Sequence, residues 1–512
     1  MVKLPLLFLW VIEKTQCHRT TTAMAPARSR STVRSRVSGV RSAISVIEER
    51  EVGTVVAVVA TTRGCASDGR PHIRSTPHTA LGVPFAREAE GGSLIVHDED
   101  GGVPALHRQP PGPPADGHAA LMPRSRPSLD VASARDVIRR IVTPSGTRPA
   151  VGLELEWHTY VAGDRSQRCD IGHLRSVCSG LELPGGSRIT FEPGGQVELS
   201  GPPLPDVGTA CDHLADDADV LVAALDSAGV EAVAAGNDPH RRPVRILDQP
   251  RYAAMEEFFD ARGAAGRRMM CGTAALQVNL DAGPDPAARW ALVHAVGPAL
   301  AAAFATSPEL GFASDRLSTW LAIDHTRTGS ALRTGDPLDD WATFALGARM
   351  MLVRHDDSDC GPFGDDLTLA DWLERGYCGT WPDQSDIAYH LTTLFPPVRL
   401  RGWLELRFLD SLPAPWWRAA AVTVATVLNS RDVGPVVAEA ARRHRTGDRW
   451  ALAARRGLGH PGLAAVALAC VQCAAEVSGD PVVAEFLERF TSKGRAPGRK
   501  AGRCTAWRPA AW

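Results

Sequence analysis

The chain of 512 residues contains only four lysines, at positions 3, 14, 493 and 500, all near its two ends. The other 52 of its 56 basic residues are arginines, a bias that the base composition of the coding DNA explains most simply. The body of the chain therefore has no lysine for a Schiff base and no GxxxxGK(S/T) phosphate-binding loop. A phosphate bound there must be held by arginine, metal ions or backbone amides.

The chain also lacks a long N-terminal hydrophobic run, a regular cysteine pattern and a strong net charge. The run LPLLFLWVI is too short to span a bilayer, and Pro26 disfavours signal cleavage after Ala25. Eleven cysteines without regular spacing in so long a chain fit a reducing compartment. With a net charge of −2, these features predict a cytoplasmic protein with neither a nucleic-acid nor a membrane partner.

The composition divides the chain into three parts. Residues 1–125 are rich in Arg, Ser, Thr, Pro and Gly and are predicted to be mostly disordered. They belong either to an anion- or nucleic-acid-binding extension or to an extension upstream of the true start, for which Met122 is a candidate. Residues 126–490 have the composition of one globular domain. Residues 491–512 form a basic, Gly-rich tail that is expected to be flexible.

Apolar periodicity predicts an α+β domain with an antiparallel sheet. Strands are expected at 151–158, 189–192, 196–200, 273–281 and 402–409. Helices are expected at 130–142, 207–228, 286–305, 338–353, 416–429, 433–444 and 461–489, with another beginning at Pro250. Cys470 and Cys473 fall in an apolar helix and are interpreted as core residues.

Four of the expected strand regions place polar residues on one face and apolar residues on the other. The polar residues are Glu154 and Glu156; Glu192, Gln196 and Glu198; Gln277, Asn279 and Asp281; and Glu405 and Arg407. A solvated sheet face is the ordinary explanation for any one such strand. Here glutamate dominates the set, and clustered glutamates repel one another unless a cation neutralises them.

The segment ITFEPGGQVELS predicts a hairpin with a three-residue loop. Pro193 and Gly194 suit the centre of a type II turn, and Gly195 suits the left-handed residue of a bulge. This loop would place Glu192 and Glu198 on the same face. We therefore predict that they hold Mg²⁺, which binds a few carboxylates and leaves room for substrate phosphates.

In the absence of lysine, arginines would grip the phosphates of a nucleotide. Arg407 lies on the polar face, and the other candidates are Arg251, Arg327 and the pair formed by Arg267 and Arg268. The sequence contains neither a zinc-binding Cys/His pattern nor an HExxH motif that would favour a different metal.

Six motifs follow one another: GLELEW, FEPGGQVELS, DQPRYAAMEEFFD, MMCGTAALQVNLD, RLSTWLAIDHTRTG and TLFPPVRLRGWLELRFLD. Together they closely resemble the glutamate–cysteine ligase family in its type-2 bacterial branch, over roughly residues 128–490. The pattern is most similar to the actinobacterial members that supply γ-glutamylcysteine for ergothioneine biosynthesis.

The resemblance implies a glutamine-synthetase-like fold, in which helices pack outside a curved, mainly antiparallel sheet with a polar concave face. It implies ATP-dependent ligation of the γ-carboxylate of L-glutamate to L-cysteine, through γ-glutamyl phosphate and with Mg²⁺. The small-molecule partners are then glutamate and cysteine, while the oligomeric state stays open.

The resemblance also implies roles for individual residues. The implied metal ligands are Glu154, Glu156, Glu192, Glu198, Gln277 and Glu405. Gln277 stands where other branches carry histidine, although its amide oxygen is still a hard donor. Arg407, Arg251 and Arg327 are expected to be catalytic, and Arg407, Asn279 and Arg268 are expected to contact the nucleotide.

Two alternatives stay open at this point. A related carboxylate–amine ligase with another amine acceptor would use the same sheet-face motifs, because those motifs handle ATP and glutamate. The second alternative is a non-catalytic relative that only binds metal or nucleotide. The retention of five glutamates and Arg407 argues against it.

Overall fold

The computed structural model describes residues 30–37, 40–47, 129–144, 150–354, 360–364, 366–445 and 447–498. The chain divides into two units, Met1–Pro113 and Pro114–Trp512. In the first unit, β1 (Arg30–Val37) and β2 (Val40–Ile47) pair as an antiparallel hairpin. The prediction that residues 1–125 are mostly disordered stays a prediction. The rest of 1–125 lies outside the described residues.

An antiparallel sheet of eight strands forms the centre of the second unit, in the order β11–β12–β8–β3–β6–β5, with β4 and β7 also paired to β3. The strands are β3 (Val151–Val161), β4 (Asp164–Arg168), β5 (Arg188–Phe191), β6 (Val197–Ser200), β7 (Val230–Val233), β8 (Ala275–Leu280), β11 (Val398–Leu400) and β12 (Leu404–Asp410). A second, two-stranded sheet pairs β9 (Leu352–Arg354) with β10 (Cys360–Pro362). The predicted α+β class with an antiparallel sheet is confirmed.

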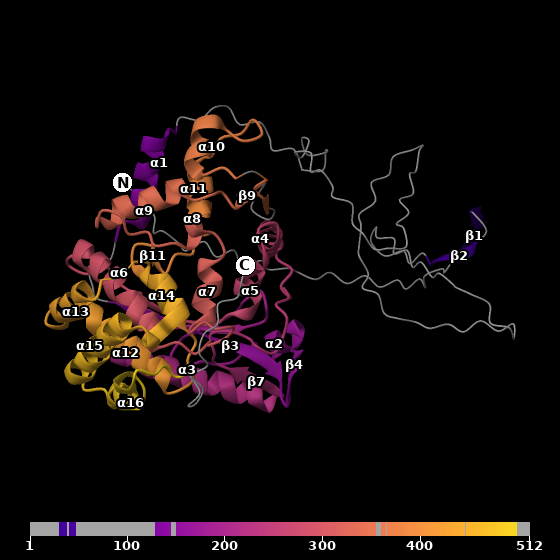
Figure 1. The fold of residues 1–512 in the computed structure, drawn as a ribbon. Helices are drawn as coiled ribbons and strands as arrows, with labels where there is room; N and C mark the ends of the chain where they lie inside the picture. The colour runs from indigo at the N-terminus through magenta and orange to yellow at the C-terminus, as the bar shows by residue number, and fades with distance from the viewer. Residues whose placement is uncertain are drawn as a thin grey trace. The chain divides into compact units, whose positions relative to one another are not determined.

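Helices account for most of the rest of this unit (Figure 1). They are α1 (Val131–Val142), α2 (Ile171–Cys178), α3 (Val207–Ser227), α4 (Pro250–Asp260), α5 (Ala264–Gly272), α6 (Pro286–Ala303), α7 (Asp315–Leu321), α8 (His325–Thr328), α9 (Pro337–Gly347), α10 (Leu369–Arg375), α11 (Gln384–Leu391), α12 (Trp416–Asn429), α13 (Val433–Arg443), α14 (Arg449–Arg456), α15 (Pro461–Ser478) and α16 (Pro481–Arg489). Short 3₁₀ turns occur at Gly457–Gly459 and Thr491–Lys493.

Aspartate caps begin several of these helices. The side chains of Asp130, Asp206 and Asp285 each accept a hydrogen bond from the backbone amide three residues later, at 2.8, 2.9 and 3.0 Å. Each cap satisfies an amide that has no partner within its own helix, a contribution of about 1 kcal/mol.

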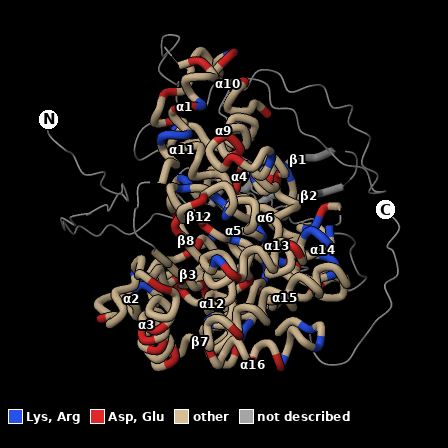
Figure 2. The backbone as a smooth tube through the Cα atoms, turned by 90° about the vertical axis from the view of Figure 1, so that its left-hand side faces the viewer, with Lys and Arg blue, Asp and Glu red and all other residues tan. Residues whose placement is uncertain are grey.

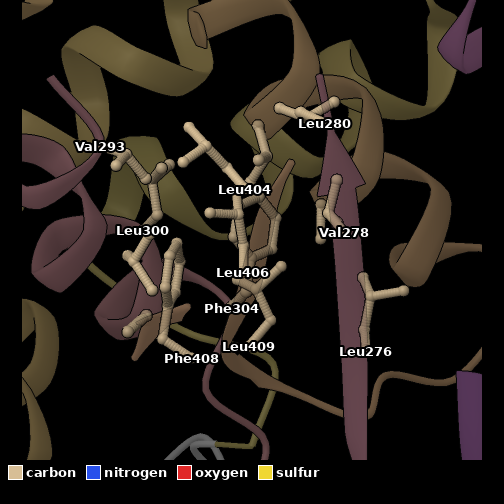
Figure 3. Close-up of a cluster of buried hydrophobic side chains, with 14 of the residues drawn as sticks. Leu276, Val278, Leu280, Val293, Leu300, Phe304, Leu404, Leu406, Phe408 and Leu409 are labelled. Carbon is tan, nitrogen blue, oxygen red and sulfur yellow. The ribbon is translucent and has the colours of Figure 1, made fainter. Parts of the chain in front are cut away.

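One face of the sheet is apolar and forms the main core (Figure 3). Val278 and Leu280 from β8 and Leu404 and Leu406 from β12 are buried beside α6. Burial of a leucine side chain contributes about 2 kcal/mol, so this layer fixes which way each strand faces. The alternate residues of the same strands must then face the other way.

The opposite side of the sheet is charged. Figure 2 shows basic and acidic segments close together around β12, β8 and β3. A second apolar cluster, separate from the main core, joins α4 and α5; it includes Met255, Phe258, Met270, Met351 and Phe395. Trp320 packs against this cluster and its ring centre lies 5.3 Å from the Arg407 guanidinium, so the cluster borders the charged side.

Two expected helix boundaries are wrong. The helix expected at 338–353 ends at Gly347. Leu352–Arg354 pairs with β10 as β9, next to backbone hydrogen bonds from the Met350 amide to the Leu367 carbonyl and from the Phe363 amide to the Met351 carbonyl. The helix expected at 461–489 breaks after Ser478, where Gly479 has a φ of 62° and Pro481 begins α16.

The predicted flexible tail begins later than expected. The backbone amide of Gly498 donates a hydrogen bond of 3.1 Å to the carbonyl of Ala305, so residues 491–498 are held against the domain. Residues 499–512 lie outside the described residues.

Among the described residues, α15 is the one helix that length and composition would allow to cross a membrane. It packs against α6, α12, α13 and α16, and Cys470 lies fully buried on its inner side. The interpretation of Cys470 as a core residue is confirmed, whereas Cys473 is only half-buried.

Candidate active site

Strand register brings the predicted polar residues onto one face of the sheet. The directly opposed pairs are Glu156 with Glu198, Glu154 with Gln277, and Glu405 with Asn279. Opposed residues in an antiparallel pair project to the same side. The four strand regions therefore contribute to one continuous surface, which we call the polar face.

The hairpin that carries Glu192 has the predicted three-residue loop. Gly195 has a φ of 89° and donates its amide to the Glu192 carbonyl at 2.8 Å, and the Glu192 amide donates to the Gln196 carbonyl at 2.9 Å. The Glu192 side chain is half-buried, and in the described part of the chain no group donates a hydrogen bond to its carboxylate. It is thus free to take a ligand.

Glu198 and Gln196 have different surroundings, although both belong to the predicted polar face. The hydroxyls of Thr190 and Ser200 each donate to Glu198 Oε1 at 2.8 Å. Gln196 is buried, and its Nε2 donates to the Thr273 carbonyl at 2.8 Å. Gln196 therefore ties the hairpin to the start of β8.

Side-chain and backbone amides hold the two glutamates of β3. Glu154 Oε1 accepts a hydrogen bond of 3.0 Å from Asn279 Nδ2. Glu156 accepts one from the Ala275 amide at 2.9 Å and one from Gln277 Nε2 at 3.3 Å. Asn279 and Gln277, predicted as nucleotide and metal contacts, orient carboxylates in the structure.

Burial and mutual repulsion raise the pKa of the four carboxyls of Glu154, Glu156, Glu192 and Glu198. Burial raises the pKa of Glu154 to about 8, assisted by the charges of Glu198 and Glu405. For Glu192, burial comes first and Glu198 second, and its pKa lies well above the usual range. The polar face is therefore short of positive charge where these carboxyls meet.

Glu405 is in the opposite situation, because three arginines surround it. Arg399 Nη2 donates to Oε1 at 2.8 Å, Arg401 Nη1 lies 3.2 Å from the same oxygen, and Arg407 Nη1 lies 3.2 Å from Oε2. Burial alone would raise its pKa, but the charges of Arg399 and Arg407 lower it below the ordinary value. Both oxygens of this predicted metal ligand are already paired.

Arg407 is held in place from several directions. Its Nη1 donates to Gln277 Oε1 at 2.6 Å, and its guanidinium lies 5.3 Å from the ring centre of Trp320. Its carbonyl accepts a hydrogen bond of 2.9 Å from Arg316, and the pairing of β12 with β8 shifts register after Leu406. The bulge and these contacts fix the arginine on the polar face.

The donor chemistry of the polar face fits a hard cation. Carboxylate oxygens are the ligands that Mg²⁺ prefers, and a cation would relieve the repulsion that raises these pKa values. Within the described ranges, however, no three His, Cys, Asp or Glu side chains are arranged to hold a metal ion as they stand. Loading would require the carboxylates to turn toward a common point.

Arg268 lies in a separate ion-pair cluster. Its Nη2 is 2.5 Å from Asp315 Oδ2 and 3.1 Å from Glu309 Oε2, and Asn237 donates to Asp315 at 3.2 Å. The predicted contact of Arg268 with a nucleotide would have to displace these partners.

Arg251 and Arg327 lie near α11 rather than on the polar face. Arg251 donates to the Thr392 carbonyl at 3.2 Å. Arg327 is fully buried and donates to Thr393 Oγ1 at 2.9 Å and to the Arg349 carbonyl at 2.6 Å. Burial lowers the pKa of Arg327 to about 9. No hydrogen bond among the described residues joins either arginine to the glutamates, so their catalytic roles stay predictions.

A family model described as glutamate–cysteine ligase family 2 (GCS2) matches residues 150–481, which include every residue of the polar face. The chain belongs to this family. Its GCS2 region accounts for all the sheet strands described above, from β3 to β12.

Curated relatives agree with this assignment. The glutamate–cysteine ligase EgtA of Mycolicibacterium smegmatis is 43% identical over 340 residues, which cover 64% of this chain and 79% of that protein. EgtA of Mycobacterium tuberculosis H37Rv is 41% identical over 361 residues, covering 68% and 83%. A solved glutamate–cysteine ligase from Francisella tularensis in complex with AMP covers 69% of this chain and 83% of its own, with 12% identity and a TM-score of 0.41, too slight a likeness to bear on function.

Several residues of this GCS2 site were not predicted from the sequence. Arg399 and Arg401 hold Glu405, and Arg316 holds the Arg407 backbone. The segment PVRLRGW did contain a signal, because two alternating arginines precede Gly402, whose φ of 83° turns the chain from β11 into β12. Arg316 had no local signal, since its partner is 91 residues away.

Proposed function

We propose that this protein is an ATP-dependent glutamate–cysteine ligase that joins the γ-carboxylate of L-glutamate to the amine of L-cysteine. The single observation that supports this best is the polar face, where Arg407 lies beside four carboxyls of raised pKa in a chain of the GCS2 family. The product, γ-glutamylcysteine, would supply ergothioneine biosynthesis, as the similarity to the mycobacterial EgtA proteins suggests.

The residues of the chain would act mainly by positioning and by neutralising charge. Arg407 would face the phosphoryl oxygens on which negative charge develops, and Glu405 and Gln277 would keep its guanidinium oriented. No side chain has to attack the substrate, because the γ-carboxylate of glutamate is itself the nucleophile. The apolar cluster of α4 and α5 beside the polar face would help to exclude water from the reactive acyl phosphate.

Mg²⁺ is part of the proposal, and Glu154, Glu156, Glu192 and Glu198 are the residues that would hold it. When bound, it would neutralise phosphate charge in the reaction. Gln277 and Glu405, predicted as further ligands, are better suited to orienting Arg407, because their oxygens already accept its hydrogen bonds. We further propose that residues 126–490 carry the activity without the N-terminal segment.

The decisive test is the dependence of ADP release on the two amino acids. The full chain with Mg²⁺ and ATP should release ADP at a high rate only when glutamate and cysteine are both supplied, with γ-glutamylcysteine as the product. Faster turnover with another amine in place of cysteine would instead identify a related carboxylate–amine ligase. Absence of ADP under every combination would indicate a relative that binds without catalysing.

The raised pKa values predict how the stability of the metal-free protein depends on pH. Glu154 has a pKa of about 8 in the folded protein against an ordinary value of 4.5, so the folded state keeps a proton that the unfolded chain has lost. The free energy of unfolding should therefore fall as pH rises from about 5 to about 8. Thermal unfolding across this range, without divalent ions, measures the slope.

The Glu154→Gln variant should flatten this slope, because its amide cannot ionise. Glu182, which is exposed, provides the same substitution as a control and should leave the slope as in the wild type. An unchanged slope in Glu154→Gln would contradict the assignment of this titration to the polar face.

A further inference from the structure

The turn that presents Glu192 is held more firmly than an ordinary hairpin turn. Each of its four consecutive carbonyl oxygens, from Glu192 to Gly195, accepts a hydrogen bond from a different donor. In chain order the donors are the Gly195 amide at 2.8 Å, the Ile246 amide at 2.7 Å, Arg168 Nη1 at 3.0 Å and Thr159 Oγ1 at 2.8 Å. Three of these donors lie outside the hairpin, so distant segments fix the turn.

Close packing on α5 removes the remaining freedom of the turn. A Cβ at Gly194 would lie 2.3 Å from the carbonyl oxygen of Cys271, and a Cβ at Gly195 would lie 2.7 Å from Ile246 Cδ1. Backbone therefore rests directly on backbone, and only glycine fits at position 194. The carboxylate of Glu192 is the one polar group of its residue without a protein partner in the described part of the chain.

Arg168, the last residue of β4, is the charged member of this arrangement. Its two terminal nitrogens bind two carbonyls in a fork, Nη1 to Gly194 and Nη2 to Arg242 at 2.9 Å. Within the described residues it has no carboxylate partner, although it is half-buried. Burial and the charge of Arg241 lower the pKa of Arg168, and the charge of Asp238 offsets this only in part. Half-burying this guanidinium is therefore costly for stability, which favours a role beyond folding.

We propose that Arg168 is a positioning residue for the metal site: it fixes the Gly194 carbonyl so that the Glu192 carboxylate stays directed into the polar face. This inference rests on the proposed role of Glu192 as a metal ligand. Arg168 links the turn to the segment after β7 through Arg242, so that β4, the turn and that segment form one rigid support. Outer partners of this kind typically change metal affinity or activity by about 10- to 100-fold when removed.

The test compares Arg168→Ala, Arg168→Lys and Gly194→Ala with Arg165→Ala in the full chain. Arg165 is the matched control, because it lies on the same strand, is exposed and pairs with Glu231. Mn²⁺ binding in the presence of ADP, followed by electron paramagnetic resonance of the free ion, reports the site without amino-acid turnover. The Mg²⁺ concentration for half-maximal ligation and the unfolding temperature are measured in parallel.

Arg168→Ala should weaken Mn²⁺ binding and raise the Mg²⁺ requirement about 10-fold. Arg168→Lys should recover part of the loss, since lysine can reach only one of the two carbonyls, and Arg165→Ala should stay within twofold of the wild type. Gly194→Ala should weaken Mn²⁺ binding as well. If Arg168→Ala does not fold, the lysine variant decides the question by the same measurements.

Mn²⁺ binding by the Arg168 variants within twofold of the wild type would overturn the inference, whether or not their unfolding temperature falls. A wild-type protein that binds Mn²⁺ with ADP but makes no γ-glutamylcysteine would refute the proposed reaction. The positioning role of Arg168 would then still be decided by Mn²⁺ binding to its variants. A wild type that binds no Mn²⁺ would refute the positioning role.

Discussion

The Glu192→Gln variant is expected to lose ligase activity by about 100-fold or more while remaining folded, because loss of a metal-held charge removes several kcal/mol of transition-state stabilisation. The glutamine keeps the size of the side chain and its place in the turn. Folding should not suffer, since the wild-type carboxyl is a repulsive group whose pKa is raised by burial and by Glu198. A neutral amide there should leave the unfolding temperature unchanged or slightly higher.

Initial rates of ADP release at saturating Mg²⁺ and low ATP, together with thermal unfolding, measure both effects. Glu182→Gln is the matched control, because it is the same substitution at an exposed site shortly before the same hairpin. Full activity in Glu192→Gln under these conditions would refute the proposed role of Glu192 as a metal ligand. A large fall in unfolding temperature would show instead that its role is structural.

The second large effect is expected at Arg407. Arg407→Ala should lower kcat by about 1,000-fold, the scale on which an arginine stabilises phosphoryl transfer. Arg407→Lys should recover little, since lysine lacks the planar fork that reaches Gln277 and Glu405 together. The measurement is kcat for ADP release, with ATP binding followed separately.

The Arg401→Lys variant tests whether the loss of kcat in the Arg407 variants comes from Arg407 itself or from any change in the ion pairs of Glu405. Arg401 approaches the same carboxylate at 3.2 Å, but its side chain is 43% exposed, so its pairing contributes little. We expect its kcat to stay within about threefold of the wild type, consistent with a weak exposed ion pair. Equal losses in Arg401→Lys and Arg407→Lys would mean that the arginines matter only through Glu405.

The alternation of residues predicted much of the sheet, because it reports directly which face of a strand is buried. Glu154 and Glu156 lie on the polar face for that reason, and the Pro-Gly-Gly loop has the expected geometry. The partners of the arginines were not predictable in the same way. Arg268 pairs with Asp315, and Arg327 with Thr393, across 47 and 66 residues of chain. No local pattern encodes such contacts.

Short elements were missed for a related reason. β11 has only three residues, too few for alternation to show, yet it contributes Arg399 to the polar face. The end of α9 was misplaced because Met350 and Leu352 continue an apolar pattern that suits a helix or a strand equally well. Tertiary hydrogen bonds, such as that from Met350 to Leu367, decide between the two.

The two separate apolar clusters have different effects on the protein. The main core behind the sheet sets the global resistance to unfolding, while the cluster of α4 and α5 adjoins the charged side. Transient loosening of the smaller cluster would admit solvent to the glutamates without melting the scaffold. Natural variants that alter Met255 or Phe258 should consequently lose more of the activated intermediate to hydrolysis. Their global stability should change little.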